Sequence, residues 1–173
     1  MSKVLFLVGM PGAGKTEWGR RIARAYSLPA VDLDAFIENR EGGTITDIFR
    51  NNGEETFRLI ESHALRQILR DTPPPFVLSS GGGTLIDQSN LFLMQQRGIV
   101  VYLKAEISTL VHNLQSGLEQ RPLLSNTADP EARLTSIYNS RKDVYEQAHH
   151  IFAVETLALT DFEPIIRKCI EPH

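Results

Sequence analysis

The sequence predicts an α/β protein in which a five-stranded parallel sheet carries helices on both faces. Three observations support this fold class. Short apolar runs alternate with longer segments of helical apolar spacing, as expected for repeated strand–helix units. The first apolar run leads directly into a glycine-rich loop that matches a phosphate-binding motif. The length of 173 residues and the 42% apolar content suit one globular domain, 1–173.

The N-terminal segment carries the most specific motif. Residues 4–8 form an unbroken apolar run, which indicates a strand buried on both faces. Residues 9–16 then read GMPGAGKT, a full match to G-x-x-x-x-G-K-[ST], and residues 17–26 have the apolar spacing of a helix. A glycine-rich turn that ends in Lys-Thr by chance is the alternative. With the strand and helix on either side, the motif indicates binding of a nucleoside triphosphate.

The chemistry of this loop explains its residue types. Glycines let successive backbone N–H groups curl around a polyphosphate, and the helix N-terminus adds unpaired donors. Lys15 is expected to reach the β- and γ-phosphates, and the Thr16 hydroxyl is expected to bind Mg²⁺. The expected nucleotide contacts are Gly12, Ala13, Gly14, Lys15, Thr16 and Glu17.

The segment from residue 29 to residue 70 continues the alternation. Residues 29–33 predict a second strand, which ends in acidic residues. Asp34 is placed to cap a short helix that the Gly42-Gly43 pair ends. Two further helices are expected at 44–51 and 53–70, each with apolar residues on one side.

The rest of the chain supplies three more strands. They are expected at 76–79, 99–103 and 151–154, with helices at 88–96, 106–115 and 130–147 and a last helix at 161–170 that Thr160 caps. Between 115 and 129 the chain is polar and contains Gly, Pro, Ser and Asn. Its length and polarity suit a mobile active-site lid, which we place at about 112–127.

The overall composition argues against several classes of partner. A formal net charge of −3 is unlike that of a general nucleic-acid binder. No apolar run approaches the length of a membrane span, and the N-terminal run is too short for a signal peptide. We therefore expect a cytoplasmic protein with no nucleic-acid or membrane partner. We also expect a monomer, although the composition does not bear on the oligomeric state.

Two acidic residues, Asp32 and Asp34, lie at the end of the second expected strand. In parallel sheets ligands lie beyond the carboxyl ends of the strands, so this point should face the phosphate loop. Asp32 and Asp34 alternate with period two, which places both carboxylates on one face. One can hold Mg²⁺ through water, and the other can bond an acceptor hydroxyl or take its proton. A helix cap with a solvated acid is the alternative.

Three arginines and a glycine run add to the expected acceptor site. Arg58 is suited to a two-bond grip on a carboxylate or phosphate, although a surface ion pair is the more frequent role of such a residue. The Gly81–Gly83 run suggests close approach of a ligand to the backbone, with a flexible turn as the alternative. Arg121 lies within the lid and is suited to stabilise phosphate charge, and Arg141 lies on the helix that returns from it. For both, a solvated helix or loop face is the alternative.

Taken in order, these motifs resemble one family. The set consists of residues 9–16, Asp32-x-Asp34, Gly53-Glu54-x-x-Phe57-Arg58-x-x-Glu61, Gly81–Gly83, Arg121-Pro122-Leu123-Leu124 and Arg141-x-x-x-Tyr145. It is similar to the shikimate kinases of the nucleoside-monophosphate-kinase-like P-loop group, over essentially the whole chain. Each motif after the first is weak alone, but the ordered set is specific.

The resemblance implies a three-layer P-loop kinase fold, with a substrate-binding region at about 33–61 and a lid. It also implies transfer of the γ-phosphate of ATP to the 3-hydroxyl of shikimate, a step in chorismate and aromatic amino-acid synthesis. By similarity, Arg58 and Arg141 clamp the shikimate carboxylate and the backbone around Gly82 faces the ring. Asp34 binds hydroxyls and is the candidate base. The remaining implied roles are Mg²⁺ binding by Thr16 and Asp32 and phosphate binding by Lys15 and Arg121.

The chain also departs from the family pattern near the expected adenine site. An arginine is common six to eight residues before the lid arginine, where this chain has the residues 112–115, His-Asn-Leu-Gln. A basic residue is common after the fifth strand, where this chain has 155–159, Glu-Thr-Leu-Ala-Leu. Nucleotide preference is therefore open, whereas the shikimate side is unchanged.

Two other functions remain as alternatives. The first is another small-molecule P-loop kinase, for gluconate or a nucleoside monophosphate. A phosphate-bearing acceptor would need more cations than Arg58 and Arg141 supply, and a neutral sugar would not need the pair. The second is a nucleotide-switched binding module without transfer activity, which the intact phosphate loop and acidic pair argue against.

Overall fold

The computed structural model describes residues 2–115 and 129–170. Its strands form one parallel five-stranded sheet in the order β2-β3-β1-β4-β5. Their bounds are Val4–Val8 (β1), Ala30–Asp32 (β2), Val77–Ser79 (β3), Gly98–Lys104 (β4) and His150–Ala153 (β5). The predicted fold class is therefore confirmed, with every strand within two residues of its expected position.

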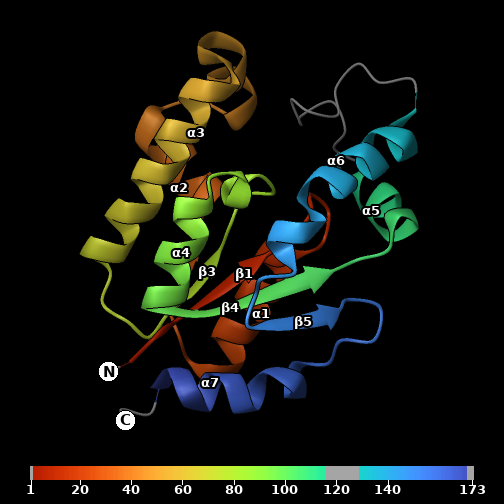
Figure 1. The fold of residues 1–173 in the computed structure, drawn as a ribbon. Helices are drawn as coiled ribbons and strands as arrows, with labels where there is room; N and C mark the ends of the chain where they lie inside the picture. Colours follow the sequence, from red (N-terminus) through yellow and green to blue (C-terminus); the bar gives the residue numbers. More distant parts are fainter. Residues whose placement is uncertain (1, 116–128, 171–173) are drawn as a thin grey trace.

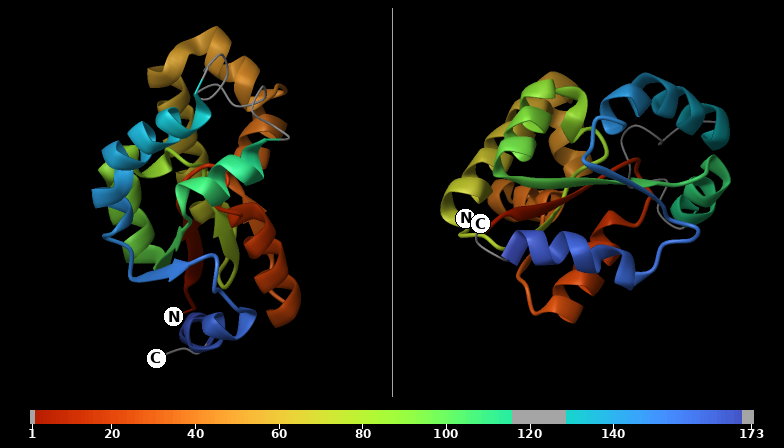
Figure 2. Two further views of the ribbon diagram at one scale, coloured as in Figure 1. Left: turned by 90° about the vertical axis from the view of Figure 1, so that its right-hand side faces the viewer. Right: turned by 60° about the horizontal axis from the view of Figure 1, so that its bottom comes forward.

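Helices cover both faces of this sheet. They are α1 (Lys15–Tyr26), α2 (Leu33–Glu41), α3 (Ile45–Asp71), α4 (Gln88–Arg97), α5 (Ile107–Leu114), α6 (Pro130–Tyr145) and α7 (Glu163–Ile170), with short 3₁₀ turns η1 (Thr84–Ile86) and η3 (Leu159–Phe162). The second view of Figure 2 shows α1 and α7 on one face and α3 and α4 on the other. Figure 1 shows α2 and α3 on one side of the phosphate loop and α5 and α6 on the other.

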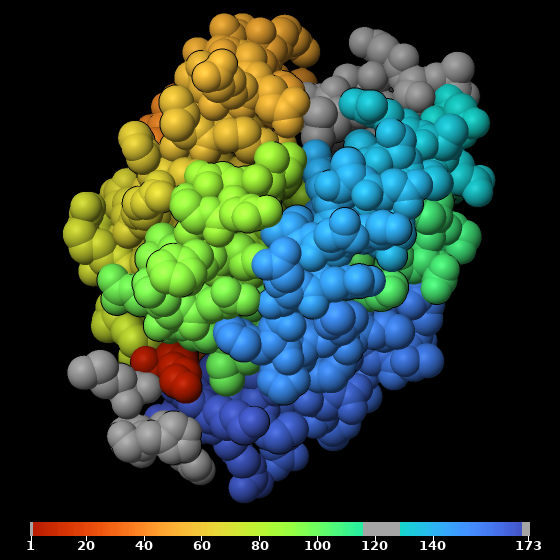
Figure 3. Space-filling model, in the orientation of Figure 1, coloured from red at the N-terminus to blue at the C-terminus, as the bar shows by residue number. Residues whose placement is uncertain are grey.

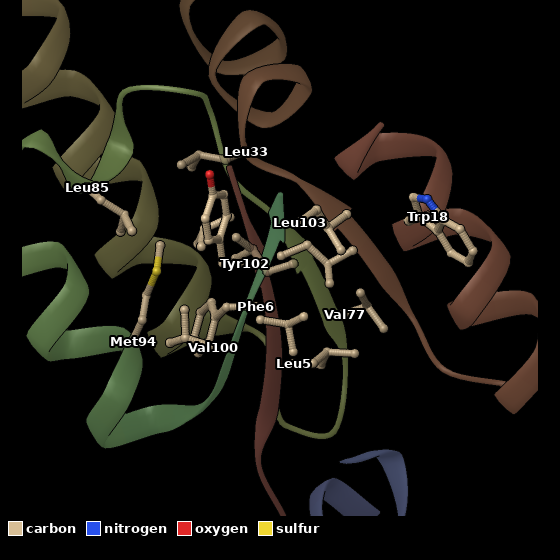
Figure 4. Close-up of a cluster of buried hydrophobic side chains, with 14 of the residues drawn as sticks. Leu5, Phe6, Trp18, Leu33, Val77, Leu85, Met94, Val100, Tyr102 and Leu103 are labelled. Atoms are coloured by element: carbon tan, nitrogen blue, oxygen red, sulfur yellow. The ribbon is translucent and has the colours of Figure 1, made fainter. Parts of the chain in front are cut away.

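The core lies on both faces of β1 and β4. All five residues of β1 are buried, and six of the seven residues of β4 are buried. Figure 4 shows their side chains between α4, which contributes Met94, and α1, which contributes Trp18. Such continuous apolar strands are expected in a sheet whose two faces are both covered, because neither face meets water.

Three local predictions differ from the structure. The single helix α3 contains a non-helical residue, Gly53 (φ 78°, ψ 169°), so the expected boundary between two helices survives as a kink. The cap of α2 is Asp32 instead of Asp34, because the helix begins at Leu33. Thr160 is not the cap of the last helix, because it lies inside η3 and α7 begins only at Glu163. In η3 the Asp161 side chain accepts a hydrogen bond from the N–H of Ala158.

The surface that carries α3, α4 and α6 is continuous in Figure 3, where α4 lies between the other two helices. The Gln95 side chain of α4 donates to the carbonyl of Gln147, just after α6, at 2.9 Å. Within 2–115 and 129–170 no helix is long and apolar enough to cross a membrane. The predicted lid coincides largely with residues 116–128, so its structure and that of Arg121 lie outside the described residues.

Candidate active site

The phosphate loop connects β1 to α1, as the motif requires. Gly12 (φ +84°) and Gly14 (φ +80°) adopt left-handed backbone conformations that residues with a Cβ rarely adopt. The Lys15 side chain is 8% exposed, and its Nζ donates to the carbonyls of Gly9 and Met10 at 2.9 Å each. The lysine thus lies folded across its own loop, with its charge where a bound polyphosphate would need it. Glu17 lies exposed in the first turn of α1.

The two acidic residues at the end of β2 belong to different elements. Asp32 ends the strand, and its Oδ2 accepts a hydrogen bond from the Thr16 hydroxyl at 2.6 Å. Its Oδ1 accepts from the N–H of Ala35 at 3.1 Å and so caps α2. Asp34 is already in the first turn of that helix. The period-two argument for a shared face is therefore wrong, because the strand ends between the two residues.

The pair of oxygens from Thr16 and Asp32 fits a hard divalent cation. A hydroxyl beside a carboxylate, next to the phosphate loop, is the oxygen-rich environment that Mg²⁺ prefers. In such sites Mg²⁺ keeps several waters and takes further oxygens from substrate phosphates. Among the described residues no group of three or more His, Cys, Asp or Glu side chains is arranged to hold a metal.

Gly81–Gly83 is tight against three parts of the protein. A Cβ on Gly81 would lie 2.6 Å from Oε1 of Glu61 and 2.9 Å from Oδ1 of Asp34. A Cβ on Gly82 would lie 2.6 Å from Cδ of Pro11 in the phosphate loop. A Cβ on Gly83 would lie 2.5 Å from Cζ of Arg58. Groups of the protein itself therefore account for the close approach to this backbone, and the approach of a ligand stays a prediction.

Arg58 lies at this turn with a buried partner. Its NH1 is 2.8 Å from Oε2 of Glu61, which is 1% exposed, and its NH2 is 3.2 Å from Oε1 of Glu54. The ion pair weighed as an alternative for Arg58 therefore exists, and one of its two partners is buried. Since an arginine carries five N–H donors, two carboxylate contacts leave it able to bind a further anion. Its Nε has no hydrogen-bond partner among the described residues.

Arg141 reaches the same turn from the opposite side. It lies on α6 and is 6% exposed, and its NH1 donates to the carbonyl of Gly82 at 2.9 Å. The positive charges of both Arg141 and Arg58 act on the hydroxyl of Tyr145 and oppose the rise that burial causes in its pKa. The two arginines thus converge on consecutive residues of one turn, although 83 positions separate them in the chain.

Several residues of this site had no assigned role in the sequence. Glu61 and Tyr145 belong to quoted motifs, and their spacing of three and four residues from an arginine on a helix is the signal that pairs them with it. Asn113 had no such signal. Its Nδ2 donates to the carbonyl of Gly12 at 2.9 Å, which joins the end of α5 to the phosphate loop.

The second departure from the family pattern also has a structural role. Burial of the Glu155 carboxyl opposes its ionisation, but its pKa is lowered by hydrogen bonds. Its Oε1 accepts from the N–H of Glu106 and from the Thr109 hydroxyl, both at 2.9 Å. These two hydrogen bonds of Glu155 therefore link the segment after β5 to the start of α5.

Together, the parallel sheet, the phosphate loop and the facing arginines define a small-molecule kinase of the P-loop class. The sequence matches the family described as shikimate kinase over residues 11–171. The shikimate kinase of Ruegeria pomeroyi is 38% identical over 171 residues, which cover 99% of this chain and 83% of that protein. The shikimate kinase of one Thermus thermophilus strain is 40% identical over 143 residues, 83% of this chain and 76% of the relative. The chain belongs to the shikimate kinase family.

Solved structures agree with this assignment. The shikimate kinase of Acinetobacter baumannii in complex with shikimate has a TM-score of 0.87 and 32% identity, covering 96% of this chain and 92% of that one. The shikimate kinase of Bacteroides thetaiotaomicron has a TM-score of 0.82 and 30% identity, with 96% of both chains covered. A gluconokinase from Sinorhizobium meliloti, at 18% identity and a TM-score of 0.55 over 98% of this chain and 90% of that one, shares the fold alone.

Proposed function

We propose that this protein transfers the γ-phosphate of ATP to the 3-hydroxyl of shikimate, giving shikimate 3-phosphate and ADP. Membership of the shikimate kinase family supports the reaction. The observation that carries the choice of acceptor is the meeting of Arg58 and Arg141 at Gly82 and Gly83, beside Pro11 of the phosphate loop. Two guanidinium groups near one backbone turn suit a single carboxylate, and the phosphate loop lies close enough for transfer.

The proposed acceptor site uses the glycine turn as its floor. Arg58 and Arg141 bind the carboxylate of shikimate through charge-assisted hydrogen bonds. Gly81, Gly82 and Gly83 present backbone to the ring. Asp34, which approaches Gly81 from α2, binds the ring hydroxyls.

On the nucleotide side, backbone N–H groups of Gly12, Ala13 and Gly14 and the N-terminus of α1 bind the phosphates. Thr16 and Asp32 hold Mg²⁺, which neutralises phosphate charge when bound. Lys15 carries a cation to the transferring group. By similarity, so does Arg121, which lies outside the described residues. Glu17 borders the nucleotide from the first turn of α1.

The chemical step forms a bond between the 3-oxygen of shikimate and the γ-phosphorus and breaks the bond from that phosphorus to the β–γ bridging oxygen of ATP. The proton of the hydroxyl passes to the Asp34 carboxylate. Because Lys15 is already held by the carbonyls of Gly9 and Met10, little reorganisation is needed to present its charge to the transition state.

A coupled assay of ADP release tests this proposal. We expect rapid ADP formation with ATP, Mg²⁺ and shikimate, and little with gluconate or a nucleoside monophosphate. Faster turnover with gluconate or a nucleoside monophosphate would show that shikimate is not the preferred acceptor and would contradict the proposal. Slow ADP formation indifferent to every acceptor would instead indicate a nucleotide-switched binding module.

The proposal also covers the oligomeric state, domain organisation, location and partners of the enzyme. It acts as a monomeric single domain in the cytoplasm, on small molecules, without nucleic-acid or membrane partners. Light scattering after size-exclusion chromatography tests the monomer, and one cooperative unfolding transition tests the single domain. A dimer mass or two separate transitions would contradict these statements.

A further inference from the structure

The carbonyl of Gly82 is held by two side chains of α6. Arg141 NH1 donates to it at 2.9 Å, and the hydroxyl of Tyr145 donates to it as well. The two side chains are four residues apart and therefore lie on one face of the helix. A carbonyl oxygen has two lone pairs, so these bonds use its full capacity and fix the direction of the peptide.

The Tyr145 side chain is itself immobilised. It is 1% exposed, and its ring stacks on Tyr102 of β4 with centroids 5.0 Å apart. Burial raises the pKa of Tyr145 to about 12, against the opposing charge of Arg141, so the hydroxyl remains a donor at neutral pH. The hydrogen bond from Tyr145 and the stacking of its ring on Tyr102 thus link the Gly82 carbonyl to β4 in the sheet.

Gly82 occupies a junction between the two halves of the site. On one side it borders Pro11 of the phosphate loop, with no room for a Cβ. The next residue, Gly83, borders the Arg58 guanidinium. A shift of the Gly82 carbonyl would therefore move the floor of the acceptor site relative to both arginines.

We propose that Tyr145 is a positioning residue for the acceptor carboxylate. This inference rests on the proposed function. By sharing the Gly82 carbonyl with Arg141, the Tyr145 hydroxyl fixes the peptide against which the Arg141 guanidinium is aligned. Without that hydroxyl, Arg141 is the one side-chain donor to this carbonyl among the described residues. The Gly82 peptide can then change its direction, and the guanidinium of Arg141 is no longer held in one orientation.

Tyr145→Phe tests this role because it removes one oxygen and keeps the ring on Tyr102. We expect the KM for shikimate to rise about fivefold to tenfold, the usual effect of one lost buried hydrogen bond, with the KM for ATP changed less than about twofold. Tyr138→Phe is the matched control. It removes a hydroxyl from the same helix, for which the described residues show no hydrogen bond, and it should leave both constants unchanged.

A second variant, Arg141→Lys, separates positioning from simple stability. If Tyr145 acts through Arg141, then Tyr145→Phe should raise the shikimate KM by less than about twofold when Arg141 is already Lys. Independent, multiplying effects would overturn the inference. So would equal rises in both KM values, or a lower melting temperature with unchanged KM values. All assays are run below the melting transition of each variant, so partial unfolding does not enter.

The activity of the unaltered chain separates a failure of the proposed function from a failure of the role proposed for Tyr145. If it fails to phosphorylate shikimate, the proposed function fails. If it phosphorylates shikimate and Tyr145→Phe has the kinetics of the unaltered chain, only the role of Tyr145 fails.

Discussion

Replacing Glu61 should cost far more stability than replacing Glu54, although both carboxylates pair with Arg58. Glu61 is 1% exposed and accepts from Arg58 NH1 at 2.8 Å and from the Thr84 hydroxyl at 2.6 Å. Glu54 pairs with Arg58 at 3.2 Å, with a side chain that is 49% exposed. The two sites therefore compare a buried and an exposed partner of one arginine.

The expected magnitudes follow from this difference. Glu61→Ala leaves the Arg58 charge and the Thr84 hydroxyl without their buried acceptor, and breaking such a pair costs about 3–5 kcal/mol. Glu54→Ala removes an exposed ion pair worth about 0–1 kcal/mol. For a chain of this size about 2–4 °C of melting temperature corresponds to 1 kcal/mol, so Glu61→Ala should melt about 10 °C lower.

Glu61→Gln adds an internal control. The amide oxygen can accept from Arg58 while the amide nitrogen donates to the Thr84 hydroxyl, whose proton then goes to the carbonyl of Gly81, already 3.1 Å away. We expect a loss smaller than that of Glu61→Ala, about 1–3 kcal/mol. Urea denaturation measures the free energy of unfolding of all three variants, and equal m-values would allow their stabilities to be compared directly. A Glu61→Ala loss below about 1 kcal/mol, or one equal to that of Glu54→Ala, would refute the reasoning.

Three further predictions concern the nucleotide and the chemical step. Lys15→Met should lower kcat about 10²-fold to 10³-fold, because the developing phosphate charge loses its fixed cation; near-normal turnover would remove Lys15 from the reaction. Asp34→Asn should lower kcat about 10²-fold or more, with the affinity for ADP unchanged, and an unaltered kcat would exclude Asp34 as the base. Asn113→Ala should weaken ADP binding about fivefold, since the carbonyl of Gly12 loses its donor. Quenching of Trp18, the chain's single tryptophan, reports ADP binding because Trp18 lies beside Gly14, and equal affinities would contradict the role of Asn113.

The sequence predicted the fold because its signals are local and repeated. The apolar run of β1 and the motif after it fix a strand, a loop and a helix within 26 residues, and no tertiary contact is needed to recognise them. The same holds for α6, where Pro130 occupies the first turn and Asp129 accepts from the N–H of Ala132 at 2.9 Å.

The choice of helix cap after β2 could not be predicted in the same way. Asp32 and Asp34 are both good capping residues two positions apart, and propensity does not separate them. The Thr16 hydroxyl, 16 positions earlier in the chain, donates to Asp32 and so favours the earlier start of α2. Because Asp32 caps the helix, the Asp34 side chain reaches the glycine turn instead.

The three glycines show a related limit of sequence reasoning. A glycine run predicts that something comes close to the backbone, but it does not distinguish a ligand from a side chain. Here a Cβ on each glycine would meet different neighbours: Glu61 and Asp34 at Gly81, Pro11 at Gly82 and Arg58 at Gly83.

Three of these neighbours, Asp34, Pro11 and Arg58, belong to the parts that the proposed transfer reaction must align. Asp34 is the candidate base, Pro11 belongs to the phosphate loop, and Arg58 is one of the two arginines that we propose bind the shikimate carboxylate. Since consecutive Cα atoms are about 3.8 Å apart, one short turn sets the spacing between all three more tightly than separate loops would. In the proposed reaction, a site assembled on one turn would be preorganised for in-line transfer, because its parts share one support, which α6 holds through hydrogen bonds to the carbonyl of Gly82.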